Sequence, residues 1–188
     1  MVTTVLLVED NPGDARLIRE MLKDGGSEQF AVEWSKTLAS GLENLSARVF
    51  DAVILDLNLP DRQGLDTFSC LHGKFPEVPV VVLTGLNDDE AGTQAVRAGA
   101  QDYLGKGIIT GSALARVIRY SIERQRADEA MRASEIRYRR LFEAAKDGIL
   151  ILDADTGKII DVNPFMLELL GYTREEFIGK RLWDIGPF

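Results

Sequence analysis

Short apolar runs alternate with stretches of helical periodicity over the first 110 residues. The runs at 5–8, 53–55 and 80–83 are rich in branched residues and lack polar alternation, which is typical of strands covered on both faces. Weaker strand candidates lie at 31–34 and 102–104. Helical spacing covers the segments near 13–24, 38–46, 64–72, 89–98 and from 111 onward. Five β-α units in this order predict an α/β fold with a doubly wound, five-stranded parallel sheet.

Polar side chains follow these strands at their carboxyl ends, where ligands bind in open α/β sheets. Glu9 and Asp10 follow the first strand, Asp56 ends the third, Thr84 ends the fourth, and Lys106 follows the fifth. Each residue alone is better explained as a helix cap, a loop carboxylate or a surface charge, but five suitable types at successive strand ends together favour a site.

The chemistry of this set points to phosphoryl transfer. Three carboxylates brought together repel one another and need a cation between them. Mg²⁺ suits them because it prefers oxygen ligands and bridges carboxylates to phosphoryl oxygens. A metal and an ammonium group would neutralise the charge of an incoming phosphoryl group, and one carboxylate could then act as the nucleophile.

The same residues resemble the receiver domain of two-component response regulators from Val5 to about Arg126. The matching segments are Leu7-Val8-Glu9-Asp10-Asn11, Asp56-Leu57-Asn58-Leu59-Pro60 with Gly64, Leu83-Thr84-Gly85 and Tyr103-Leu104-Gly105-Lys106. The resemblance implies a flavodoxin-like receiver fold in which Asp56 accepts phosphate from a histidine kinase or a phosphotransfer protein. It also implies which residues bind the ion and the phosphate. Mg²⁺ would be held by Glu9, Asp10, Asp56 and the main-chain carbonyl of Asn58, and the phosphoryl oxygens by Thr84 and Lys106.

The resemblance further implies a conformational switch formed by Thr84 and Tyr103, with the Tyr103 ring rotating inward after phosphorylation. An aromatic residue on an edge strand is equally well explained as part of the core. Lys106 is followed by Gly107 where the family usually has Pro. Because Gly allows more backbone conformations, we expect weaker coupling between phosphorylation and the last strand and helix.

Four other residues of this region lie near the predicted site or carry reactive side chains. By resemblance, Asn58 and Leu86 flank the acceptor and the switch hydroxyl and tune the lifetime of the phosphate. We interpret Cys70 as a small buried hydrophobe and His72 as a surface residue, neither of them catalytic.

A long helix is predicted from Ser112 to Ala145, a stretch without Pro or Gly. A 4-3 repeat runs through Tyr120, Arg124, Ala127, Met131, Ser134, Tyr138, Leu141 and Ala145. This spacing is that of a coiled-coil seam, so we expect a parallel homodimer through the 112–146 helix. Arg124 and Ser134 interrupt the apolar stripe, and a single solvated connector is the alternative.

A different pattern begins at Asp147. Apolar runs at 149–152 and 158–162 flank a turn sequence and predict a hairpin, and capping signals at 163–164 and 173–176 predict two short helices. Four segments from Tyr138 to Trp183 resemble the first half of a PAS sensory domain: Leu141-Phe142-Glu143, Asp147-Gly148-Ile149, Asp161-Val162-Asn163-Pro164 and Leu170-Gly171-Tyr172-Thr173. We expect this segment to be truncated and to be the least stable part. Residues 138–188 contain no His or Cys, so neither haem nor flavin photochemistry is supported.

The net charge of −8 is unevenly distributed. Residues 1–110 carry −8, residues 111–146 carry +4, and residues 147–188 carry −4. An acidic balance disfavours binding to nucleic acid, and alternating signs in the basic zone are typical of a solvated helix face. No apolar run approaches the length of a membrane span, and a single Cys without a basic amino-terminal region favours the cytoplasm.

Together these patterns predict three parts: a receiver domain at 1–125, a helical linker at 112–146 that continues the last receiver helix, and an α+β PAS-like segment at 138–188. The predicted function is a phosphorylation-controlled switch that relays its state through the linker and is not a turnover enzyme. The alternative is an interaction or dimerisation module that takes no phosphate. An aspartyl-phosphate phosphatase is disfavoured because an Asp-x-Asp motif is absent from the first strand end.

Overall fold

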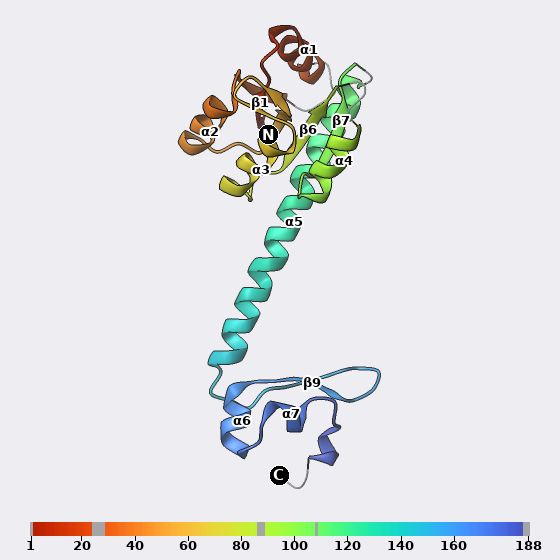
Figure 1. Cartoon of the computed structure of the whole chain (residues 1–188). Coiled ribbons are helices and arrows are strands. Elements are labelled where there is room, and N and C mark those ends of the chain that lie inside the picture. Colours follow the sequence, from red (N-terminus) through yellow and green to blue (C-terminus); the bar gives the residue numbers. More distant parts are fainter. Residues whose placement is uncertain (1, 24–28, 86–88, 108, 186–188) are drawn as a thin grey trace. The chain divides into compact units, whose positions relative to one another are not determined.

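A computed structural model describes residues 2–23, 29–85, 89–107 and 109–185 (Figure 1). The chain divides into two compact units, Met1–Asp128 and Glu129–Phe188. Helix α5, Gly111–Ala144, contributes residues to both units and confirms the predicted long helix. Leu86 and the last three residues of the PAS-like segment lie outside the described residues.

The first unit contains the predicted five-stranded parallel sheet, in the order β2-β1-β3-β6-β7. The strands are β1 (Val2–Val8), β2 (Gln29–Ser35), β3 (Ala52–Asp56), β6 (Val80–Thr84) and β7 (Asp102–Gly105). The other helices are α1 (Pro12–Lys23), α2 (Leu38–Ala47), α3 (Leu65–Lys74) and α4 (Asp89–Arg97). The strand order reverses at β1 and β3, so the carboxyl ends of these two strands form the switch point where ligands bind in such sheets.

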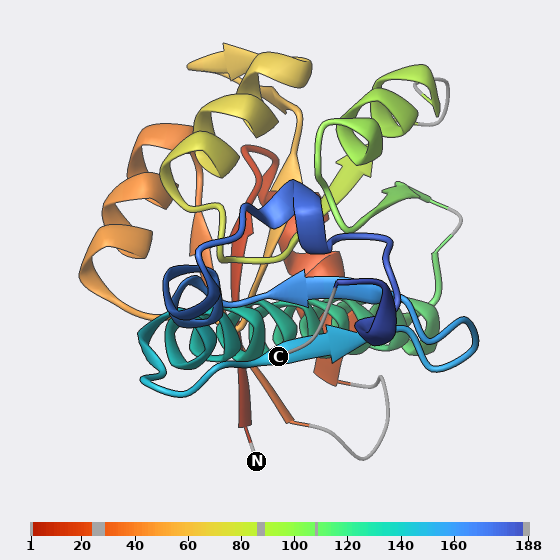
Figure 2. The same ribbon diagram turned by 90° about the horizontal axis from the view of Figure 1, so that it is seen from below.

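Each face of the sheet is covered by its own layer of helices. One core cluster joins alternate residues of β1, β3 and β6 to α2, α3 and α4, and the other joins the intervening strand residues to α1 and α5. Figure 2 shows α2, α3 and α4 together on their side of the sheet. The central strands β3 and β6 are buried at every position, which explains why they appear in the sequence as unbroken apolar runs.

A small hairpin that the sequence did not predict follows the third strand. Strands β4 (Asn58–Leu59) and β5 (Arg62–Gln63) pair antiparallel, and Asp61 lies in their turn. The Asp61 carboxylate accepts hydrogen bonds from the N–H groups of Leu38 and Ala39 at 3.0 and 2.9 Å, at the start of α2. Gly64 then adopts a φ of +64°, a left-handed conformation that favours glycine, before α3 begins.

His72 is only half-exposed, so the expectation of a surface residue is wrong. Its ring stacks on Phe68 with centroids 5.1 Å apart and lies against Gly99. Cys70 is also half-buried and packs against the core, in keeping with its interpretation as a hydrophobe. Both residues lie on α3; Cys70 is covered by the core of this face, and His72 by Phe68 and Gly99.

The second unit has the predicted hairpin and short helices. Its elements are β8 (Leu150–Leu152), β9 (Ile159–Val162), α6 (Pro164–Leu170), α7 (Arg174–Phe177) and a 3₁₀ turn at Leu182–Asp184. The two strands pair antiparallel and lie side by side in Figure 2. The buried core cluster of this unit is small, comprising Ile159, Val162, Phe177 and Ile185. Ile160, on the other face of β9, is 53% exposed.

Candidate functional site

Three carboxylates converge at the switch point of the sheet. Glu9 and Asp10 follow β1, and Asp56 ends the neighbouring strand β3. Each offers an oxygen atom, and these oxygens lie within 4.8 Å of one another. Glu9 and Asp56 are buried, whereas Asp10 is exposed. Parallel strand topology therefore brings together the acidic residues that the sequence singled out.

Lys106 lies between two of these carboxylates. Its Nζ is 2.6 Å from Glu9 Oε2 and 2.7 Å from Asp56 Oδ2. The loop that carries it is anchored to the neighbouring strand, because the Lys106 N–H donates to the carbonyl of Thr84 at 2.8 Å. The ammonium group is thus fixed beside the candidate acceptor.

Burial and charge oppose each other in this cluster. Burial raises the pKa of the Glu9 carboxyl to about 7, although its hydrogen bond with Lys106 acts in the opposite direction. Burial alone would lower the pKa of Lys106, but hydrogen bonds to Asp56 and Glu9 outweigh it and raise that pKa above its ordinary value. Lys106 therefore remains an ammonium group at physiological pH.

Thr84 places a hydroxyl at the same edge of the sheet. It ends β6, the strand that pairs with β3, and its side chain is buried. Its Oγ1 has no hydrogen-bond partner among the described residues. The Asn58 N–H donates to Asp56 Oδ1 at 3.0 Å, which orients the Asp56 carboxylate. A hard-oxygen donor set beside a free buried hydroxyl and an ammonium group suits Mg²⁺ with a phosphoryl group.

Tyr103 is half-buried on β7 and packs against the core. Its ring lies so close to Gly92 of α4 that a Cβ atom on Gly92 would overlap it. The structure thus shows the core contact, and the switch role of Tyr103 stays a prediction. Gly107 adopts a φ of +92°, which Pro cannot adopt because its ring holds φ near about −65°.

Two residues that sequence reasoning missed support this site. Asp14, in the first turn of α1, lies 3.3 Å from Lys106 Nζ through its Oδ2. Thr67, buried in α3, donates its hydroxyl to the carbonyl of Leu57, the residue directly after Asp56, at 2.8 Å. The sequence offers one indication of both residues: each is a polar side chain in the first turn of a helix that comes after a strand end with a candidate site residue.

Replacing Thr67 with Val is expected to lower the free energy of unfolding by about 1–2 kcal/mol, because it leaves a buried carbonyl without its donor. Thr67→Ser retains the hydroxyl and should retain most of this stability. Urea-induced unfolding measures the difference. Loss of stability in the Ser variant but not in the Val variant would assign the effect to packing of the γ-methyl group, which Val keeps, and not to the hydrogen bond.

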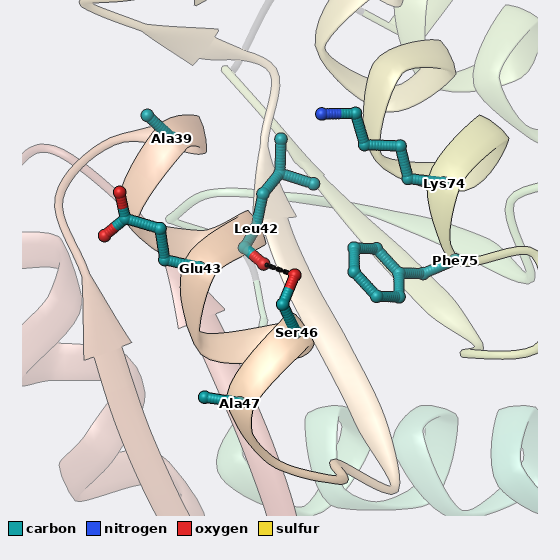
Figure 3. A pocket seen from close by; sticks show the side chains of 7 residues that line it. All are labelled: Ala39, Leu42, Glu43, Ser46, Ala47, Lys74 and Phe75. Atoms are coloured by element: carbon teal, nitrogen blue, oxygen red, sulfur yellow. Dashed lines mark hydrogen bonds between the residues drawn. The ribbon is translucent and has the colours of Figure 1, made fainter.

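A shallow groove of about 540 Å³ lies elsewhere, between α2 and α3. Figure 3 shows Leu42 of α2 on the side of Lys74 and Phe75, whereas the Glu43 carboxylate points away from them. The hydrogen bond drawn there, from Ser46 Oγ to the carbonyl of Leu42, is internal to α2. The groove brings together no group of nucleophilic or metal-binding side chains.

Comparison with known families gives two matches along the chain. Residues 5–119 match the response regulator receiver domain, and residues 136–188 match a PAS domain. The chain is 36% identical over 129 residues to the KDP operon transcriptional regulatory protein KdpE of Escherichia coli, covering 69% of this chain and 55% of that protein. It is 30% identical over 179 residues to the transcriptional regulatory protein KdpE of Mycobacterium tuberculosis, covering 95% of this chain and 77% of that protein.

Solved structures agree with the sequence match. A response regulator receiver domain protein from Clostridium thermocellum superposes with a TM-score of 0.59 at 25% identity, covering 66% of this chain and 98% of that one. Among the described residues, no helix has the length and apolar character that crossing a membrane requires. The chain belongs to the response regulator receiver family, with a PAS-like segment after the receiver domain.

Proposed function

We propose that this chain is a phosphorylation-controlled signalling switch in which Asp56 accepts a phosphoryl group from a histidine kinase or a phosphotransfer protein. The observation that carries the proposal is the setting of Asp56, whose carboxylate lies 2.7 Å from the Lys106 ammonium and within 4.8 Å of the carboxylates of Glu9 and Asp10. A carboxylate in this setting is poised to receive a phosphoryl group and not to act as a general acid.

The proposed transfer is a nucleophilic displacement at phosphorus. An oxygen of Asp56 attacks the phosphorus of a phosphohistidine, an O–P bond forms, and the P–N bond breaks with its electron pair returning to the imidazole. Mg²⁺, held by Glu9, Asp10, Asp56 and the Asn58 carbonyl, would neutralise charge on the phosphoryl oxygens. Lys106 and the Thr84 hydroxyl would bind the oxygens of the product.

Incubation with a small phosphodonor, acetyl phosphate, tests this function directly. We expect one phosphoryl group per chain in the presence of Mg²⁺ and none after chelation, measured by intact mass. A chain that gains no mass would be an interaction module with a receiver fold. Sustained release of inorganic phosphate over many turnovers would instead indicate a phosphatase, against our proposal that this chain is no turnover enzyme.

The proposed relay begins in the receiver domain, which we place at 1–125. Phosphate would draw the Thr84 hydroxyl toward Asp56 and let the Tyr103 ring move inward, so two receiver conformations would differ at β7 and α4. Two polar contacts connect helix α5 to loops of the receiver domain that precede β3 and β7. Arg126 pairs with Asp51 at 3.0 Å, and Gln101 donates to Gln125 at 3.2 Å. A shift in β7 would therefore reach the helix that we assign as the 112–146 linker to the PAS-like segment at 138–188.

We further propose that α5 forms a parallel coiled coil with a second copy. Seven of the eight seam residues are exposed and the eighth is half-exposed. Met131 is 74% exposed and Leu141 67% exposed, so the seam is available to a partner helix. This dimer would set the geometry through which the relay acts in the cytoplasm. Because the receiver domain is acidic, it would repel nucleic acid phosphates, so we propose that it acts through contacts with other proteins.

Met131→Asp is expected to convert the dimer to a monomer, because it places a charge in the apolar seam. Ile136→Asp is the matched control, since Ile136 is 53% exposed on the opposite side of the same helix. Sedimentation at micromolar concentration, with and without phosphodonor, measures both. A strict monomer in the parent chain, or dissociation by the Ile136 variant alone, would contradict this seam.

A further inference from the structure

Lys106 contacts three carboxylates, one of which lies outside the group that would hold the metal. Asp14 Oδ2 is 3.3 Å from Lys106 Nζ, although the two residues are 92 positions apart in the sequence. Asp14 is not among the three carboxylates whose oxygens converge at the strand ends. We propose that Asp14 is a positioning residue that holds Lys106 at the site when Mg²⁺ occupies Glu9 and Asp56. This inference rests on the proposed function.

The start of α1 fixes Asp14 relative to Glu9. The Asn11 N–H donates to Glu9 Oε1 at 3.1 Å, and the Gly13 N–H donates to the Asn11 side chain at 2.8 Å. Pro12 opens the helix with a fixed φ, so this turn has little freedom. Asp14 follows directly and faces Lys106 from the first turn of the helix.

The surroundings strengthen the contact between Asp14 and Lys106. Both residues line a mostly apolar cavity of about 360 Å³, together with Leu17, Ile18, Leu83 and Ile109. Apolar walls lower the local dielectric constant, which makes an ion pair stronger than it would be on an open surface. Asp14 remains 39% exposed, so its own charge costs little to maintain.

The Asp14–Lys106 contact matters because the Lys106 ammonium and Mg²⁺ would compete for the same carboxylates. Lys106 shares Glu9 and Asp56 with the proposed Mg²⁺ site, and a divalent ion there would both take these partners and repel the ammonium. Asp14 offers Lys106 a carboxylate that the metal does not use. Without Asp14, Lys106 would hold Glu9 and Asp56 more exclusively, so Mg²⁺ would bind more weakly.

Trp34 provides a reporter for this equilibrium. Its Nε1–H donates to the main-chain carbonyl of Glu9 at 2.7 Å, so a change at Glu9 should alter its fluorescence. The sequence has two Trp residues, and Trp183→Phe leaves Trp34 as the source of the signal. Calorimetric titration of the same chain with Mg²⁺ gives the affinity independently of fluorescence.

The decisive experiment is a double-mutant cycle in the full chain at fixed ionic strength. Asp14→Asn is expected to weaken Mg²⁺ binding about tenfold in the parent chain and to have no effect in the Lys106→Met background. Asp14→Glu should restore most of the affinity. Glu20→Gln, which removes a charge from an α1 residue paired with Lys23, should leave it unchanged.

The outcomes separate this inference from the function on which it rests. Equal weakening by Asp14→Asn with and without Lys106 would mean a direct field effect and would overturn the positioning role, with the Mg²⁺ site intact. Unchanged affinity in Asp14→Asn overturns it as well. A parent chain that binds no Mg²⁺ would overturn both the inference and the proposed function.

Discussion

Replacing Asp56 with Asn is expected to abolish phosphate uptake from acetyl phosphate. The amide keeps the size of the side chain and can keep its oxygen at the Asn58 N–H, which the carboxylate contacts at 3.0 Å. It lacks the anionic oxygen that attacks phosphorus and is the poorer nucleophile. Intact mass before and after incubation with Mg²⁺ measures the effect. Asp66→Asn is the matched control because Asp66 is exposed in the first turn of α3.

The pair of variants also locates the acceptor. If the Asp56 variant still took up phosphate and the Asp66 variant did not, the acyl phosphate would be on Asp66. This result would contradict the proposed function. Uptake retained in both would move the acceptor outside this pair. Treatment with hydroxylamine, which cleaves acyl phosphates and not phosphoesters, distinguishes a carboxylate acceptor from a hydroxyl one.

The sheet could be predicted because burial on both faces leaves a direct mark on the sequence. The apolar runs of β1, β3 and β6 lie where the core lies, and Pro12 begins the first helix as its chemistry suggests. The hairpin β4–β5 escaped prediction because its strands are two residues long and mostly exposed. The stacking of His72 on Phe68 depends on tertiary packing, which local periodicity does not encode.

Some contacts of the candidate site could be predicted from the sequence and others could not. Strand ends in a parallel sheet share one edge, so the proximity of Glu9, Asp10 and Asp56 follows from topology once the strands are known. That Lys106 contacts Glu9 as well as Asp56 does not follow, because it depends on the path of the loop after β7. Asp14 was missed for a related reason: the contact joins a helix start to that loop.

Four hydrogen bonds of the second unit converge on one buried amide, the side chain of Asn163. The Asn163 side chain is fully buried, and its Oδ1 accepts hydrogen bonds from the N–H groups of Ile149 and Met166 at 2.9 and 3.1 Å. Its Nδ2 donates to the carbonyls of Phe142 and Asp147 at 3.2 and 2.9 Å. These four bonds use the full capacity of an amide group. They join the end of α5 to the residue that precedes strand β8 and to the start of α6.

Asn163→Ala is therefore expected to lower the free energy of unfolding of this unit by about 3–4 kcal/mol, because it removes a helix cap and leaves buried main-chain groups unpaired. Amide hydrogen exchange at Ile149 and Met166 should accelerate strongly, while exchange in the central strands of the receiver sheet stays unchanged. Thr173→Ala, which removes an exposed capping hydroxyl bonded to Glu176, is the control and should cost about 1 kcal/mol.

A small effect in the Asn163 variant would mean that the four apolar residues of the core cluster hold the unit without the amide. A large one has a functional consequence. Because the same side chain bonds the last turns of α5 and the first residues of the hairpin, any rotation of α5 would have to pass through Asn163 or break its bonds. We therefore expect the proposed relay to fail in Asn163→Ala even where the proposed phosphate uptake at Asp56 is normal.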